Sequence, residues 1–225
     1  MKAVIFDLDN TLIKSFTDYV KMKKEIIAYL RKVGVESEVL TPKHTTVEMV
    51  KEAARQLKER GKTEEEIASV MVGVNEVMNR VELENVDRAL PLNGAEELLK
   101  TLKEAGVKVG ILTRGCESYA RGALKVTGLL SYVDAINARV DLLQAKPNPK
   151  ALLDLCRKLE VDPSEVIFVG DHPIDVICAN VAGVKFIGVL EGFTSEEKMR
   201  QIGSRINFKN LLAVKEYLIE KIEEC

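Results

Sequence analysis

Short runs of consecutive apolar residues recur along the chain, and most are rich in valine, isoleucine and phenylalanine. The clear runs lie at residues 2–7, 107–113, 166–170 and 185–190, and weaker ones lie at 133–138 and 206–208. Continuous apolar runs of this length are typical of strands that are buried on both faces of a parallel sheet. We therefore expect a parallel sheet, with residues 206–208 as a short strand at its edge.

Helical periodicity fills the intervals between these runs. Apolar residues recur three and four positions apart at 94–105, 117–127, 149–159, 174–182 and 210–223. Glycines directly follow three of these segments, at a position where glycine commonly ends a helix; they are Gly106, Gly128 and Gly183. The alternation predicts an α/β fold, a doubly wound parallel sheet with helices on both faces.

The stretch from about residue 14 to residue 88 interrupts this alternation. It has helical periodicity and no convincing strand, and we expect helices at 16–33, 42–60 and 63–86. Thr63 and Glu66 fit an N-terminal capping box. We therefore expect a core domain of residues 1–14 and 89–225, with a separate helical domain of residues 15–88 inserted into it.

Composition narrows the class of protein. The 225 residues are 46% hydrophobic and 30% charged, which permits a sizeable core beneath a polar surface. A formal net charge of -2 and the absence of tryptophan argue against a nucleic-acid binder. No apolar run is long enough for a membrane span or a signal peptide. The widely spaced cysteines form no C-x-x-C pair, so we expect a reducing, cytoplasmic setting.

Polar side chains follow several of the expected strands at the point where each strand ends. They are Asp7, Asp9, Thr113, Asp171 and Asp175, and Lys146 lies in a proline-flanked loop. Because the carboxyl ends of parallel strands meet at one edge of a sheet, we expect these side chains to lie together. Clustered carboxylates repel one another unless a cation binds, and oxygen ligands suit Mg²⁺. The lysine and the hydroxyl suit a phosphate group, so the site suits phosphoryl transfer.

These residues occur in the order of four motifs of the haloacid dehalogenase-like (HAD) hydrolases, which the chain resembles over nearly its whole length. The motifs are Asp7-x-Asp9-x-Thr11, Thr113, Lys146 and Gly170-Asp171-x-x-x-Asp175. Within that family the chain resembles the phosphoglycolate phosphatase-like branch. The resemblance implies a HAD-like Rossmannoid core and identifies the inserted segment 15–88 as a helical cap domain.

The resemblance also implies the roles of the acidic residues. Asp7 would attack phosphorus and form an aspartyl-phosphate. Asp9 would protonate the leaving oxygen and then deprotonate the attacking water. The Asp7 and Asp171 carboxylates and the backbone carbonyl of Asp9 would ligate Mg²⁺, and Asp175 would support that site.

The remaining motif residues would bind the substrate's phosphate. The resemblance assigns this role to Thr113 and Lys146, and we add Arg114 as the neighbour of Thr113 in the sequence. Lys146 would also offset the charge between nucleophile and phosphate, which makes it a catalytic residue. Thr11 would support the acidic site. Asn10 and His172 depart from the commoner residues of the family, and neither change removes a catalytic group.

The expected function is that of a Mg²⁺-dependent phosphatase that hydrolyses a small organic phosphate monoester. 2-Phosphoglycolate is the first candidate substrate, from the resemblance alone. Asp9 favours a phosphate ester, since family dehalogenases lack an aspartate at this position. Two alternatives stay open: a sugar phosphomutase of the same branch, and a non-catalytic member that senses phosphate or binds a partner. We expect a small phosphorylated metabolite as partner, no nucleic acid or membrane, and a monomer or homodimer.

Overall fold

The computed structural model describes residues 1–38, 40–192 and 194–224, which fold into two compact units. Unit 1 comprises Met1–Phe16, Val86–Val140 and Gln144–Cys225. Unit 2 comprises Thr17–Asn85 and the short segment Asp141–Leu143. Cys225 itself lies outside the described residues.

Unit 1 is built on a parallel sheet whose strand order is β5-β4-β1-β6-β7-β8 among the described residues. The strands are β1 (Ala3–Phe6), β4 (Lys108–Leu112), β5 (Ala135–Asn137), β6 (Val166–Gly170), β7 (Lys185–Val189) and β8 (Asn207–Phe208). Each coincides with an apolar run of the sequence, and β8 forms the expected edge. The prediction of a doubly wound parallel sheet is confirmed.

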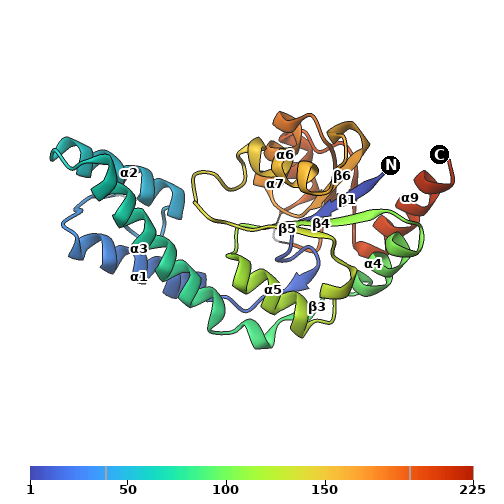
Figure 1. Ribbon diagram of the computed structural model, residues 1–225, viewed down its shortest axis with the longest axis horizontal. Helices are drawn as coiled ribbons and strands as arrows, with labels where there is room; N and C mark the ends of the chain where they lie inside the picture. The colour runs from blue at the N-terminus through green and yellow to red at the C-terminus, as the bar shows by residue number, and fades with distance from the viewer. Residues whose placement is uncertain (39, 193, 225) are drawn as a thin grey trace. The chain divides into compact units, whose positions relative to one another are not determined.

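Alternate residues of the central strand face opposite layers of helices. Val4 and Phe6 of β1 belong to one apolar core, and Ala3 and Ile5 belong to the other. The first core includes side chains of α4 (Ala95–Glu104), α5 (Glu117–Val126) and α9 (Leu211–Glu223). The second includes side chains of α6 (Pro149–Lys158), α7 (Pro173–Ala182) and α8 (Glu196–Gln201). Figure 1 shows α6 and α7 on one side of the strands and α5 on the other.

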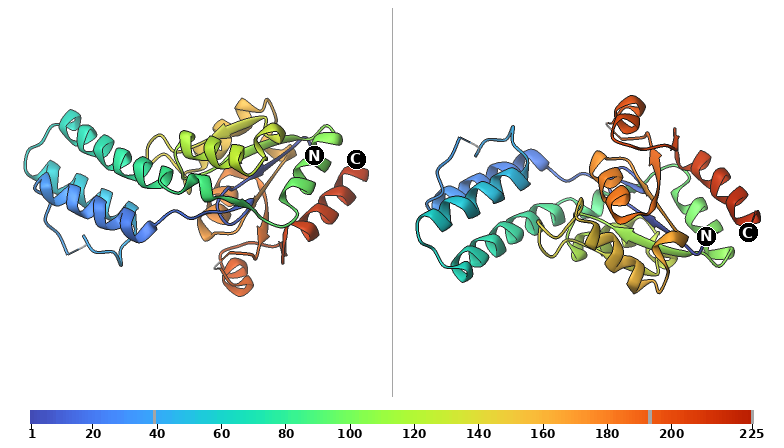
Figure 2. Two further views of the ribbon diagram at one scale, coloured as in Figure 1. Left: turned by 90° about the horizontal axis from the view of Figure 1, so that it is seen from below. Right: turned by 90° about the horizontal axis from the view of Figure 1, so that it is seen from above.

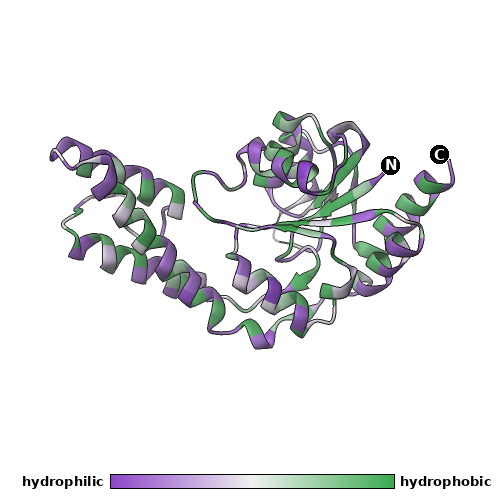
Figure 3. Cartoon of the chain, viewed as in Figure 1, coloured by the Kyte–Doolittle hydropathy of each residue, from purple (hydrophilic) through white to green (hydrophobic). Residues whose placement is uncertain are grey.

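The strands carry most of the apolar character, as their green colour in Figure 3 shows, whereas the helices alternate between green and purple. The glycines expected to end three helices, at positions 106, 128 and 183, have φ values of 72°, 76° and 71°. These values lie in the left-handed region that glycine adopts without strain, so those helix ends are confirmed. Short 3₁₀ turns η1 (Val86–Arg88), η2 (Leu130–Tyr132) and η3 (Pro163–Glu165) connect elements.

Three short elements were not predicted. Helix α8 has six residues, which is too few for a clear helical period. Strands β2 (Ile13–Lys14) and β3 (Leu90–Pro91) pair antiparallel with two residues each. Pairs this short leave no alternation in the sequence.

Unit 2 contains the helices α1 (Tyr19–Lys32), α2 (Thr46–Glu59) and α3 (Glu64–Leu83). Figure 2 shows α1 and α3, drawn in blue and teal, lying side by side. The predicted capping box of Thr63 and Glu66 is present at the start of α3. The apolar faces of the helices form one core, and Leu142 of the segment Asp141–Leu143 is buried in it. None of the described helices is both long and apolar enough to cross a bilayer.

Candidate active site

A tight turn follows β1 and carries the first two candidate aspartates. The backbone N–H of Asp7 donates to the carbonyl of Val169 on the neighbouring strand, at 2.9 Å. The N–H groups of Leu12 and Ile13 both donate to the carbonyl of Leu8, at 2.9 and 3.1 Å, and close the turn. Asn10 has a φ of 59°, a left-handed conformation that asparagine tolerates better than most residues.

The end of β6 and the start of α7 carry the other aspartates. Gly170 ends β6, and a Cβ atom there would lie 2.7 Å from Oδ2 of Asp175, so a side chain at 170 would displace that carboxylate. His172 is the N-cap of α7, where its Nδ1 accepts from the N–H of Ile174 at 3.2 Å. Asp175 completes a capping box by accepting from the N–H of His172 at 3.1 Å.

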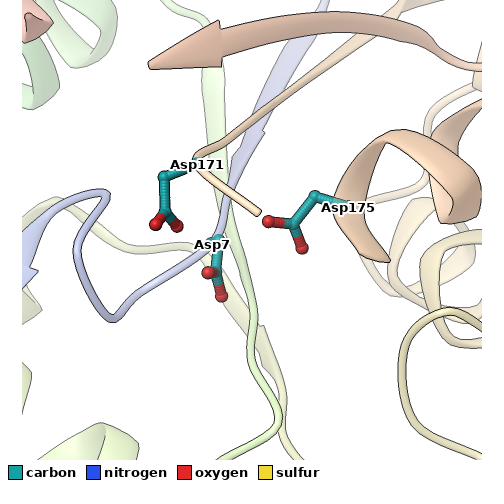
Figure 4. Close-up of side chains that lie close together, drawn as sticks. All are labelled: Asp7, Asp171 and Asp175. Carbon is teal, nitrogen blue, oxygen red and sulfur yellow. The ribbon is translucent and has the colours of Figure 1, made fainter. Parts of the chain in front are cut away.

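Three carboxylates converge from these two strand ends. Asp7, Asp171 and Asp175 each place an oxygen within 4.8 Å of the others, and they are 8%, 4% and 0% exposed. Figure 4 shows the three carboxyl groups close together. The hydroxyl of Thr11 donates to Oδ1 of Asp171 at 3.1 Å. The buried cluster therefore has the oxygen donors that a hard divalent cation prefers.

Lys146 is the cation of the site. Its Nζ lies 2.5 Å from Oδ1 of Asp7 and 2.8 Å from Oδ1 of Asp175, and the residue is 2% exposed. The loop that carries Lys146 ends at Asn148, whose side chain caps α6. One ammonium thus bridges two carboxylates in a dry part of the protein, where charges interact more strongly than in water.

Burial and mutual repulsion perturb the acids. Burial raises the pKa of Asp7 to about 6, with Lys146 opposing that shift and the charge of Asp175 adding to it. Burial raises the pKa of Asp171 to about 7, and the charges of Asp7 and Asp175 add to the shift. For Lys146, burial alone would lower the pKa, but the charges of Asp175 and Asp7 raise it above its ordinary value. The lysine therefore stays charged at neutral pH.

The remaining candidates lie around this cluster. Thr113 is buried directly after β4, and its Oγ1 accepts from the N–H of Gly115 at 3.0 Å. The carbonyl of Arg114 accepts from Nε of Arg139 at 2.7 Å. The carboxylate of Asp9 is not a member of the described acid cluster, and its Oδ1 accepts a hydrogen bond from the hydroxyl of Tyr119.

Sequence reasoning identified the acids and the lysine but not every contact. It had no reason to select Tyr119, because a tyrosine in an amphipathic helix has the pattern of any core aromatic residue. It also left the role of His172 open, and the structure places that side chain at the N-cap of α7. Partial desolvation lowers the pKa of His172, and its Nδ1 accepts a hydrogen bond, so the neutral ring suits the cap.

A doubly wound sheet with buried carboxylates and one lysine at its carboxyl edge places the protein among the α/β enzymes that bind ligands at this edge. Residues 4–189 match the protein family described as "Haloacid dehalogenase-like hydrolase". The chain belongs to this family, and it is a phosphatase of the HAD type.

Individual relatives agree with this assignment. The chain is 30% identical over 190 residues to validoxylamine A 7'-phosphate phosphatase of Streptomyces hygroscopicus subsp. limoneus, covering 84% of this chain and 85% of that protein. It is 27% identical over 198 residues to phosphoglycolate phosphatase of Xylella fastidiosa (strain Temecula1 / ATCC 700964), covering 87% and 83%. The crystal structure of a hydrolase from Pseudomonas syringae has the same fold, with a TM-score of 0.66 and 23% identity over 98% of this chain and 99% of that one.

Proposed function

We propose that this protein is a Mg²⁺-dependent phosphomonoesterase that acts through an aspartyl-phosphate on Asp7. The observation that carries the proposal is the convergence of Asp7, Asp171 and Asp175, with Lys146 paired to the first and the last of them. Three ionised carboxylates and one ammonium leave a net charge of -2 in a buried space. A divalent cation would neutralise this charge, and a phosphate ester would bring its own negative oxygens to the same place.

The residues present fit Mg²⁺. Their donors are carboxylate oxygens, which hard cations prefer. Burial first and mutual repulsion second raise the pKa values of Asp7 and Asp171, and a bound cation would offset both effects. Asp7, Asp171 and the backbone carbonyl of Asp9 would hold the ion, with Asp175 and Thr11 in support. When bound, Mg²⁺ supplies positive charge that stabilises the phosphoryl oxygens in the transition state.

The chain's own residues account for both chemical steps. A carboxylate oxygen of Asp7 attacks phosphorus, and the bond between phosphorus and the ester oxygen breaks. Asp9 donates its proton to that oxygen, so the product leaves as an alcohol. A water molecule then attacks the aspartyl-phosphate while Asp9 takes its proton, which releases phosphate and restores both carboxyl groups. Lys146 compensates the negative charge that nucleophile and phosphate bring together.

Phosphate binding and specificity involve further residues. Thr113 would donate its hydroxyl to a phosphate oxygen, because the contact with Gly115 uses only an acceptor site of Oγ1. Arg114 would add a positive charge beside it. Residues 15–88 would act as the cap domain that selects the substrate. 2-Phosphoglycolate is the first candidate, supported by the relatives named phosphoglycolate phosphatase, although another relative is named for a different ester, validoxylamine A 7'-phosphate.

Phosphate release from a panel of esters tests the proposal. The panel holds 2-phosphoglycolate, several sugar phosphates and an aryl phosphate, each assayed with Mg²⁺, with a chelator and with the Asp7→Asn variant. We expect release that requires both Mg²⁺ and Asp7. Asp154→Asn is the matched control, because Asp154 pairs with Arg157 on the surface of α6 and should leave the rate unchanged. An isomerised sugar phosphate in place of free phosphate would indicate a mutase and overturn the proposal.

A further inference from the structure

The hydroxyl of Tyr119 donates to Oδ1 of Asp9, the residue proposed above as general acid and base. Asp9 lies in the turn after β1, and Tyr119 lies in the first turn of α5, so the contact joins two segments far apart in the sequence. Both residues belong to unit 1. Side chains of a helix lean toward its N-terminus, which directs a residue of the first turn of α5 back to the carboxyl edge of the sheet.

The ring of Tyr119 is held by its surroundings. The residue is 2% exposed and is a member of the apolar core beneath the sheet. Gly115 lies against the ring, where a Cβ atom would approach Cδ1 of Tyr119 to 2.6 Å. A side chain packed this closely has little room to change rotamer, which restricts the position of its hydroxyl. Asp9, by contrast, is only half-buried, on a short side chain with two soft torsions.

We propose that Tyr119 is a positioning residue that orients the carboxyl group of Asp9 for proton transfer. The inference rests on the proposed function, in which Asp9 moves the proton. With Oδ1 accepting from Tyr119, Oδ2 is the atom that carries the proton. Asp9 gives this proton to the ester oxygen as the aspartyl-phosphate forms, and its Oδ2 takes one from water as the aspartyl-phosphate is hydrolysed. The tyrosine hydroxyl stays a donor to Oδ1 in both steps.

A buried tyrosine hydroxyl needs a hydrogen-bond partner whatever its role, so burial alone does not distinguish positioning from packing. The difference lies in the kinetics. An alkyl phosphate needs a proton on its poor leaving group, whereas an aryl phosphate with a good leaving group does not. The ratio kcat/KM reports the formation of the aspartyl-phosphate, and kcat includes its hydrolysis, for which Asp9 is the base with every substrate.

The test compares Tyr119→Phe with wild type on 2-phosphoglycolate and on p-nitrophenyl phosphate, both with Mg²⁺. We expect kcat/KM for the alkyl ester to fall about 10-fold or more, as general acid-base catalysis contributes roughly 10²–10⁴-fold. For the aryl ester, kcat/KM should change by less than about 3-fold, because formation of the aspartyl-phosphate needs no proton from Asp9. Its kcat should fall because hydrolysis of the aspartyl-phosphate is slowed, and KM should fall by the same factor. Asp9→Asn should show the same pattern with larger effects. If wild type is inactive on 2-phosphoglycolate, the best alkyl ester of the panel replaces it.

Tyr132→Phe is the matched control. Tyr132 lies in the same unit, its hydroxyl donates to Glu96 on the surface at 3.2 Å, and its loss should change neither substrate's kinetics. Gly115→Ala is a second variant that keeps the hydroxyl but pushes the ring. A Cβ at this position would also lie 3.5 Å from Oγ1 of Thr113, which affects both substrates alike, so the expected result is a larger loss of kcat/KM for the alkyl ester than for the aryl ester.

An equal loss of kcat/KM on both substrates, or no loss on either, would overturn the positioning role while leaving the phosphatase intact. If Asp7→Asn releases phosphate as fast as wild type, the proposed function itself is overturned, and the role of Tyr119 is overturned with it. The two failures are therefore distinguishable in one set of assays.

Discussion

Replacing Lys146 with methionine removes the positive charge of the lysine ammonium and keeps most of the side chain's volume. Lys146 is 2% exposed, and its Nζ contacts Asp7 and Asp175 at 2.5 and 2.8 Å. The variant leaves both carboxylates buried without their cation. Breaking a buried ion pair by removing one partner costs about 3–5 kcal/mol of unfolding free energy, and we expect a loss in this range at about pH 8.

The loss should depend on pH. A carboxyl group whose pKa is raised in the folded state binds protons there at pH values where the unfolded chain has released them. The group's contribution to the free energy of unfolding therefore decreases as the pH rises from its ordinary pKa toward its raised pKa. The raised pKa is about 6 for Asp7. Without Lys146 that pKa rises further, so protonation at about pH 5 relieves the buried charge and the loss should fall to about half or less.

Urea unfolding of both proteins in the presence of a chelator, at the two pH values, measures these differences. Lys103→Met is the matched control, because Lys103 pairs with Asp134 at 2.5 Å but is 37% exposed. An exposed pair contributes about 1 kcal/mol or less, so this control should be nearly as stable as wild type. A loss for Lys146→Met no larger than that of the control, or one that is equal at both pH values, would refute the reasoning.

Three further results are expected. Mg²⁺ should raise the melting temperature more at about pH 8 than at about pH 5.5, because the pKa values of the proposed ligands Asp7 and Asp171 are raised to about 6 and about 7. An Asp171→Asn variant that keeps the full Mg²⁺-induced shift in calorimetry would contradict the ligand role of Asp171. Gly170→Ala should lower kcat about 10-fold or more by displacing the Asp175 carboxylate, and unchanged steady-state kinetics would disprove it. Leu142→Ala should lower the free energy of unfolding in urea by about 2–5 kcal/mol, because Leu142 is buried in the core of unit 2. Leu143 is 42% exposed and should tolerate alanine, so equal losses for the two variants would count against the burial of Leu142.

The sheet could be predicted because burial on both faces leaves continuous apolar runs. Strands β1, β6 and β7 agree with the expected runs to within two residues. The elements that were missed are the short ones, since α8 and the pair of β2 and β3 contain too few residues for a period to appear. Helix α2 begins at Thr46, later than expected, because Thr45 and Glu48 form a capping box that periodicity alone does not locate.

The sequence predicted that Asp7, Asp171, Asp175 and Lys146 lie together, but it did not predict their contacts. Asp7 and Asp171 follow neighbouring strands, so topology alone brings them to one edge of the sheet. The bridge that Lys146 makes to Asp7 and Asp175 depends on side-chain torsions in a loop, which leave no mark in the sequence. The burial of Leu142 in the core of unit 2 is likewise a tertiary contact, because nothing in its local pattern separates it from the exposed Leu143.

The proposed reaction depends on a phosphoryl group carried by Asp7. With Asp9→Asn and an aryl phosphate, the first step needs no proton and the second lacks its base, so the aspartyl-phosphate should accumulate. Acid quenching followed by intact-protein and peptide mass spectrometry would detect it. We predict a gain of one phosphoryl group, mapped to the peptide that contains Asp7 and absent when Asp7→Asn is added. An Asp9→Asn enzyme that turns over without phosphorylating Asp7, or that is labelled at another residue, would contradict the account.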